Sequence, residues 1–204
     1  MSSGKHYKRK AYRRRSNNRK RLLLSIVLLV VIISAIGVYI MFSGNEPIDP
    51  YQDSTKVLLT TNMGNILIEL RNDMPITTEN FKNLTQHGIY DNTIFHRVIV
   101  DFMIQGGDPT GTGYGDPSIP NIPDEFTTDN HNNRGTISMA NAGPNTGSSQ
   151  FFINVVDNNY LDSKHPVFGR VIEGMDVVDA ISLVPVNNEK PIEEVVIIKA
   201  EIQN

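Results

Sequence analysis

Residues 138–153 read SMANAGPNTGSSQFFI, a β-like run that breaks into a loop of small residues and then returns to large apolar ones. Gly143, Pro144 and Gly147 are residue types that turns and long hairpin connections favour. A loop of small side chains also allows a ligand to approach the backbone closely. Taken alone, the stretch fits a β-hairpin connection better than a binding loop.

A second unusual stretch, residues 95–108, reads FHRVIVDFMIQGGD and places a cation and an amide among large apolar side chains. Arg is seldom buried without a partner. One interpretation of Arg97 is therefore structural: its stem packs on the sheet while its head reaches water or an acidic residue. The other interpretation is that Arg97 and Gln105 face a binding site, and these residues alone do not decide between the two.

Short apolar runs separated by Gly, Pro and Asn recur along the rest of residues 55–204, a pattern typical of a many-stranded antiparallel sheet. Helical spacing predicts one helix that starts at Pro75 and stops at Gly88, and a second helix at 175–183. The pattern therefore predicts a closed or nearly closed β-sheet with two helices. The predicted strands are 57–61, 65–70, 94–100, 102–105, 136–140, 151–156, 167–172 and 192–202.

Charge is distributed very unevenly along the 204 residues. Residues 1–44 hold ten Lys and Arg and no acidic residue, so the remainder holds nine basic and 22 acidic residues, a net charge of −13. The length allows one well-buried domain with a short appendage and excludes two large domains. The absence of cysteine excludes disulfides, thiolate metal sites and cysteine nucleophiles.

An apolar segment, residues 22–42, reads LLLSIVLLVVIISAIGVYIMF and contains 21 residues without a charge. A helix of that length rises about 30 Å, the thickness of a bilayer core, so the segment predicts one transmembrane helix. A cleaved signal peptide, which would leave a secreted protein, is the alternative. Its apolar region is usually shorter and ends in small residues, whereas this segment ends in bulky ones, so we favour an uncleaved anchor.

A basic run, residues 5–21, precedes the apolar segment and reads KHYKRKAYRRRSNNRKR. Basic residues beside a membrane span keep that end in the cytoplasm, so we expect a cytoplasmic tail at 1–21 and an extracytoplasmic C-terminal domain. Nucleic-acid attachment by the same run is a less favoured alternative. Residues 43–54 are polar and include two prolines, so they predict a spacer before the domain at 55–204.

Read together, the two stretches resemble the signature segments of cyclophilins, whose pattern runs FHR, FMxQGGD and SMANAGPNTxxSQFF. Further agreement lies at 111–113, at 124–126 and at 160–171, YLDSKHPVFGRV, which is similar to the family's WLDGKHVVFGKV. Several ordered segments are much more specific than one short motif. The chain is therefore identified as a member of the cyclophilin-type peptidyl-prolyl cis/trans isomerases.

The resemblance implies a mainly β fold, a closed eight-stranded antiparallel β-barrel capped by two α-helices, with substrate in a groove on the outside. It implies that Arg97 is the catalytic residue. The residues that line or flank the proline pocket are implied by position to be Phe102, Met103, Gln105, Ala140, Asn141, Gln150, Phe152, Leu161 and His165.

These residue types suit the isomerisation of X-Pro bonds. Rotation breaks amide resonance against a barrier of about 18–20 kcal/mol. The guanidinium of Arg97 stays protonated and could favour the twisted amide by a hydrogen bond near the proline nitrogen, and an apolar pocket would favour the less dipolar twisted form. We assign His165 to the pocket lining, without proton transfer. No metal and no other cofactor is implied.

The expected partners are proline-containing peptides and folding proteins, and the membrane through Leu22 to Phe42; we expect a monomer and no specific nucleic acid. Tyr160 stands where many eukaryotic cyclophilins carry Trp, so cyclosporin binding is in doubt because the indole donor is missing. The short loops between 107 and 136 resemble compact prokaryotic members. The alternative function is a membrane-tethered proline-peptide binding module or holdase without essential turnover, which the intact residue set disfavours.

Overall fold

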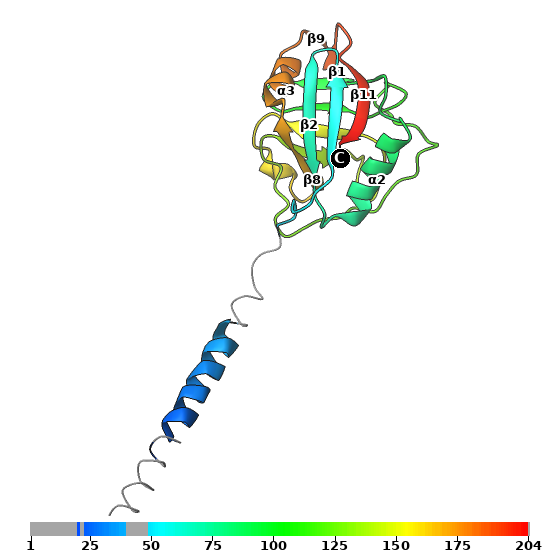
Figure 1. The fold of residues 1–204 in the computed structure, drawn as a ribbon. Helices are drawn as coiled ribbons and strands as arrows, with labels where there is room; N and C mark the ends of the chain where they lie inside the picture. The colour runs from blue at the N-terminus through cyan, green and yellow to red at the C-terminus, as the bar shows by residue number, and fades with distance from the viewer. Residues whose placement is uncertain (1–19, 21–22, 40–48, 204) are drawn as a thin grey trace, which may run out of the picture. The chain divides into compact units, whose positions relative to one another are not determined.

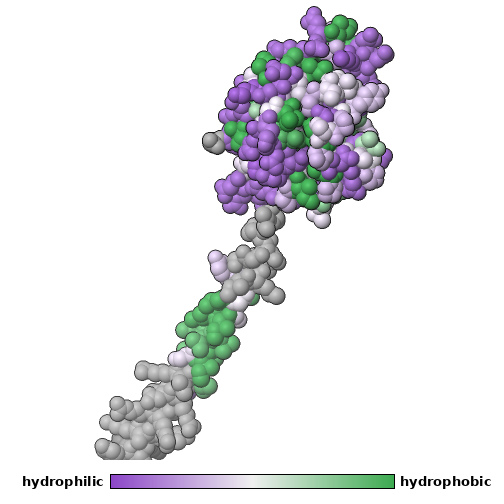
Figure 2. Space-filling view, turned by 90° about the vertical axis from the view of Figure 1, so that its right-hand side faces the viewer, coloured by the Kyte–Doolittle hydropathy of each residue, from purple (hydrophilic) through white to green (hydrophobic). Residues whose placement is uncertain are grey.

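The computed structural model describes residues 20, 23–39 and 49–203. The chain divides into two compact units, Met1–Ile48 and Asp49–Asn204. In the first unit, residues 23–39 form a helix, and Figure 2 shows this helix as an apolar surface. Within the described residues, no helix is both long enough and apolar enough to span a bilayer. Residues 22 and 40–42 of the predicted span lie outside the described residues, as do most of the predicted tail and residues 43–48 of the predicted spacer.

In the second unit, the described residues form one antiparallel nine-stranded sheet and a small two-stranded sheet (Figure 1). The strand order of the large sheet is β3-β11-β1-β2-β8-β6-β7-β5-β4. Its strands are β1 Lys56–Thr61, β2 Gly64–Leu70, β3 Thr93–Ile94, β4 Arg97–Ile99, β5 Met103–Gly106, β6 Thr136–Met139, β7 Phe151–Asn154, β8 Val167–Glu173 and β11 Val196–Gln203. The small sheet pairs β9 Val186–Asn187 with β10 Lys190–Pro191.

Two α-helices accompany the sheets, α2 Pro75–Gln86 and α3 Met175–Ser182, and they confirm the two helices predicted in this part of the sequence. Pro75 stands at the first position of α2, where its missing N–H costs nothing. A short 3-10 helix, η1 Asn159–Leu161, was not predicted. The mainly β prediction with two helices is therefore confirmed for the domain.

The predicted closure of the barrel is wrong, because the sheet is open and β3 and β4 stand at opposite ends of its strand order. The predicted strand 94–100 breaks into β3 and β4. An irregular segment occupies the seam: the N–H of Phe95 donates to the carbonyl of Val195 at 2.9 Å, and the N–H of Val98 donates to the carbonyl of Glu189 at 2.7 Å. In a closed barrel, β3 and β4 would form hydrogen bonds with neighbouring strands at this seam. Here the irregular segment accepts hydrogen bonds from the backbone N–H groups of Phe95 and Val98 instead.

The core combines alternate residues of the strands with the inward faces of the helices. In β1 and β2 every second residue is buried, which is the period of a half-buried strand. The ring of Phe81, from α2, lies 4.9–5.5 Å from the rings of Tyr90, Phe151 and Phe168. Val178 of α3 is fully buried in the same cluster. Sheet and helices therefore share one continuous core.

Residues 49–54, predicted as the end of the spacer, lie on the domain in the structure. The guanidinium of Arg170 lies 3.9 Å from the centre of the Tyr51 ring, close enough for a cation–π interaction. The N–H of Asn72 also donates to the carbonyl of Pro50 at 2.8 Å. We call these contacts of Tyr51 and Pro50 the Tyr51 clasp; it fixes the chain just before β1.

Candidate active site

Three predicted site residues form a row across neighbouring strands. Arg97 of β4 lies opposite Gln105 of β5, and Gln105 lies opposite Phe152 of β7. Directly opposed residues of antiparallel strands project from the same face of a sheet. Their sequence neighbours Val98 and Ile104 belong to the core. The row of Arg97, Gln105 and Phe152 therefore faces outward.

Two apolar side chains are buried on this outward face. Met103 is 1% exposed and Phe152 is 4% exposed, yet neither belongs to the core cluster. Met103 lies two residues before Gln105 on the same strand, so the two side chains share a face. The ring of His165 covers Phe152 edge-on, with ring centroids 5.3 Å apart. We call Met103 and Phe152 the apolar floor.

His165 stands beside the apolar floor as a neutral ring. Its Nδ1 lies 3.0 Å from the carbonyl oxygen of Met139, and because a carbonyl only accepts, Nδ1 carries the proton in this contact. Burial lowers the pKa of His165 below its ordinary value of 6.5, and the hydrogen bond to Met139 only partly opposes this. A neutral ring held in this way suits a wall of an apolar pocket.

A cavity of about 500 Å³ adjoins the row at Gln105. It lies between the loops 113–121 and 140–148, and four predicted site residues line it: Gln105, Ala140, Asn141 and Gln150. The side-chain amide of Gln105 donates to the side-chain carbonyl of Gln150 at 2.9 Å. The other predicted residues, Arg97, Phe102, Met103, Phe152, Leu161 and His165, lie outside its lining. The predicted set thus divides into residues that line this cavity and residues that lie outside it.

The stretch 138–153 proves to be both a hairpin connection and part of this cavity. It joins β6 to β7, which pair with each other. The N–H of Ala140 donates to the carbonyl of Gln150 at 3.0 Å, so the ladder continues into the loop. The side chain of Asn141 donates to the carbonyl of Lys164 at 2.8 Å. That bond connects the loop to the segment that carries His165.

One wall of the cavity depends on a buried carboxylate that the sequence did not single out. Asp108 is fully buried and accepts hydrogen bonds from the N–H groups of Thr110, Gly113 and Gly115 at 2.7–3.2 Å. Burial disfavours its charge, but the hydrogen bond from the Thr110 hydroxyl and those from the three N–H groups together outweigh burial and hold the pKa of Asp108 below its ordinary value. Gly113 and Gly115 have φ of +86° and +82°, which glycine adopts readily. Residues 110–115 are therefore a loop ordered by Asp108.

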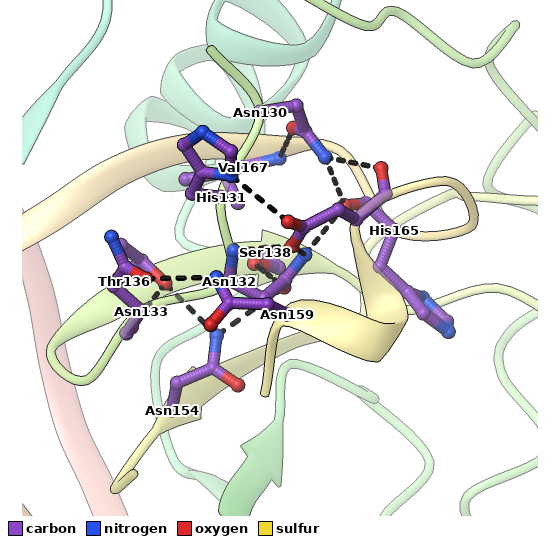
Figure 3. Close-up of polar contacts among 11 residues, drawn as sticks. Asn130, His131, Asn132, Asn133, Thr136, Ser138, Asn154, Asn159, His165 and Val167 are labelled. Atoms are coloured by element: carbon purple, nitrogen blue, oxygen red, sulfur yellow. Dashed lines mark hydrogen bonds and ion pairs between the residues drawn. The ribbon is translucent and has the colours of Figure 1, made fainter. Parts of the chain in front are cut away.

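The wall that contains Leu161 and His165 is held by side-chain amides (Figure 3). The amide groups of Asn130 and Asn132 donate to the carbonyl of His165 at 3.2 and 3.3 Å. The N–H of Asn132 donates to the carboxylate of Asp162 at 2.7 Å. All members of this amide network are at most 7% exposed. They are Asn130, Asn132, Asn154 and Asn158.

Phe102 joins the same wall through Asn158, whose amide donates to the carbonyl of Phe102 at 2.9 Å. The ring of Phe102 stacks on that of Tyr160, with centroids 6.3 Å apart. Tyr160 is 67% exposed and Leu161, the last residue of η1, is half-buried. Tyr160, noted in the sequence only as a replacement for Trp, therefore covers Phe102.

Arg97 has an acidic partner as well as a place in the outward row. Its Nε donates to the carboxylate of Glu189 at 2.6 Å, and the two side chains are 41% and 51% exposed. Both interpretations of Arg97 therefore hold in part: its head pairs with an acidic residue, and its side chain also lies in the outward row beside the cavity. Sequence reasoning missed Glu189, and no local pattern could have indicated it, because 92 positions separate the pair.

An outward row that ends in a guanidinium, an apolar floor and an adjoining cavity thus lie together on the outer face of an open antiparallel sheet. Residues 56–202 match the family model of the cyclophilin type peptidyl-prolyl cis-trans isomerases. This chain belongs to that family.

Individual relatives agree with this assignment. Peptidyl-prolyl cis-trans isomerase-like 1 of Gibberella zeae is 47% identical over 154 residues, which cover 73% of this chain and 95% of that protein. Peptidyl-prolyl cis-trans isomerase ppi1 of Schizosaccharomyces pombe is 51% identical over 149 residues, 71% of this chain and 96% of that protein. With these relatives, the family match shows that the chain is a peptidyl-prolyl cis-trans isomerase.

A solved structure is similar as well. It is the crystal structure of a Cryptosporidium parvum cyclophilin type peptidyl-prolyl cis-trans isomerase in the presence of the dipeptide Ala-Pro, with a TM-score of 0.70 and 37% identity over 73% of this chain and 99% of that chain. This structure and the two relatives come from eukaryotes, so they do not support the prokaryotic character predicted from the short loops.

Proposed function

We propose that Arg97 accelerates rotation about X-Pro bonds by favouring the twisted amide of a proline that rests on the apolar floor. The outward row of Arg97, Gln105 and Phe152 supports this proposal most directly. Neighbouring strands lie about 4.8 Å apart, so the long side chain of Arg97 can reach a ring held two strands away at Phe152. The guanidinium would then lie near the reacting amide.

The physical basis is the loss of amide resonance during rotation. In the twisted form the nitrogen lone pair is localised and can accept a hydrogen bond, which Arg97 can always donate because it does not lose its proton near neutral pH. The twisted amide is also less dipolar than the planar one, so an apolar floor disfavours it less. His165, neutral and edge-on to Phe152, would confine the proline ring.

Peptide residues beside the proline would lie along the cavity at Gln105. Its lining includes Asn141 and loop backbone, which can pair with an extended peptide and demand little of its sequence. Broad substrate use would suit a protein that assists folding, since uncatalysed isomerisation takes tens of seconds or longer. We propose proline-containing segments of folding proteins as the substrate class.

Replacing Arg97 tests the proposed mechanism. We expect the purified chain to accelerate isomerisation of a short proline peptide, and Arg97→Ala to lower kcat/KM about tenfold or more because the donor is lost. Arg134→Ala is the matched control, since Arg134 is similarly exposed and also pairs with a carboxylate, Asp179 at 2.7 Å. A folded wild-type protein without activity, or equal losses in both variants, would contradict the mechanism.

The proposed location is a membrane surface, with residues 22–42 as anchor and the domain outside the cytoplasm. Its support is the sequence: 21 uncharged residues follow a stretch rich in Lys and Arg and free of acidic residues. Protease added to intact cells should then digest the domain and spare the N-terminal tail. A domain that is digested only after lysis would contradict this orientation, and one released into the medium would indicate cleavage.

A further inference from the structure

β4, which carries Arg97, is an end strand of the sheet and pairs on one side only, with β5. Its other side meets the β9–β10 hairpin. The N–H of Val98 donates to the carbonyl of Glu189 at 2.7 Å. The Nε of Arg97 donates to the carboxylate of the same residue at 2.6 Å. One hairpin residue therefore holds both the backbone of β4 and its guanidinium.

The backbone of this hairpin does not favour a glutamate. Its two turn residues, Asn188 and Glu189, have φ of +48° and +65°. Two-residue turns with positive φ at both positions prefer Asn followed by Gly. Asn188 fits the first position, whereas a long side chain at the second is disfavoured by the left-handed backbone. A local conflict of this kind is expected where the side chain has a use.

The contact with Glu189 leaves most of the guanidinium available. A carboxylate at Nε fixes the plane of the group and leaves both terminal nitrogens for another acceptor. In the part of the chain that the structure describes, Glu189 is the single hydrogen-bonding or ionic partner of the Arg97 side chain. The neighbour of Arg97 in the row, Gln105, is engaged with Gln150. The terminal N–H groups can therefore meet a substrate.

We propose that Glu189 is a positioning residue, which orients the guanidinium of Arg97 before the substrate arrives. The inference rests on the proposed role of Arg97. A long Arg side chain loses rotational freedom when it binds, and a partner that orders it in advance reduces that loss. Both side chains are half-exposed, so water and salt weaken the pair and its effect on the rate is modest.

The test uses the full chain with three variants. Glu189→Gly removes the carboxylate but suits the positive φ and keeps the main-chain bond to Val98. Glu189→Gln keeps the length and an accepting oxygen without the charge. Asn188→Gly changes the adjacent residue of the same turn, which has no contact with Arg97, and is the matched control.

We expect Glu189→Gly to lower kcat/KM of a proline peptide about two- to fivefold, Glu189→Gln to lose less, and Asn188→Gly to leave it unchanged. Magnetisation-transfer NMR at saturating peptide should show that Glu189→Gly lowers the rate of cis/trans exchange. The affinity for the peptide should stay unchanged, and Tm should be unchanged or slightly raised. A merely structural role would instead lower Tm together with activity.

A double-mutant cycle with Arg97→Lys completes the test, because Lys has no Nε donor. In that background Glu189→Gly should have no further effect. Full activity of Glu189→Gly, increased activity, or an equal loss in the Arg97→Lys background would overturn the inference while the proposed function stands. An inactive wild-type chain or an active Arg97→Ala variant would overturn the proposed function itself.

Discussion

The two sides of the groove are held in opposite ways. On the β4 side, Arg97 is fixed by one exposed carboxylate, and the pair contributes little to stability. On the other side, the wall of Leu161 and His165 is fixed by the amide network, whose members are at most 7% exposed. A buried amide cannot move without leaving polar groups unpaired. The comparison indicates a rigid wall on the His165 side and, on the β4 side, an Arg97 side chain oriented by an exposed pair that adds little stability.

The largest effect is expected from breaking the rigid wall. Asn132 is fully buried and binds Ser138, Asp162 and His165. Asn132→Ala should lower the free energy of unfolding by about 2–4 kcal/mol, because it removes buried side-chain hydrogen bonds and leaves the hydroxyl of Ser138 without its acceptor. Urea unfolding measures the loss. Asn159→Ala, which removes an exposed amide bound to Asn133 at 2.9 Å, is the control and should cost less than about 0.5 kcal/mol.

A smaller effect is expected from acid, again on the rigid wall. The unfolded chain protonates His165 near 6.5, whereas burial lowers its pKa in the folded domain. The unfolded state therefore binds the proton first, so stability should fall as the pH drops below 6.5 and be unaffected by this group above it.

Urea unfolding above and below that pH, in wild type and His165→Gln, measures this contribution. The variant should lose less stability on acidification. Some dependence should remain, because burial also lowers the pKa of His96. An identical pH dependence in both proteins would show that His165 does not contribute.

The smallest change in stability is expected on the β4 side of the groove, at Arg97. Arg97→Ala should alter the free energy of unfolding by less than about 0.5 kcal/mol, although it should remove most of the activity. Urea unfolding of the same preparations used for kinetics provides the measurement. A loss above about 2 kcal/mol would show that Arg97 supports the fold, and the comparison of the two sides would fail.

Much of the fold follows from patterns within short stretches of sequence. The alternation in β1 and β2, the helix that begins at Pro75, and the small-residue connection at 138–153 all lie where the sequence predicts them. Each depends on residues that are neighbours along the chain. The family resemblance adds the functional residues, because it rests on letters whose order the chain preserves.

The features that the sequence does not reveal depend on distant contacts. Hydropathy cannot separate Met103 and Phe152 from core residues, since all are large, apolar and buried. The break between β3 and β4 depends on a seam supplied by a segment almost one hundred residues later. Asn132 is polar and would be expected at the surface, yet its partners make it fully buried.

The Tyr51 clasp determines where mechanical tension on the preceding chain is first resisted. β1 is paired on both sides, with β2 and β11, and a pull along its axis would shear two ladders. The stacked pair of Tyr51 and Arg170 and the bond from Asn72 to Pro50 lie ahead of it along the chain. A pull that enters at residue 49 must release these contacts before it loads β1.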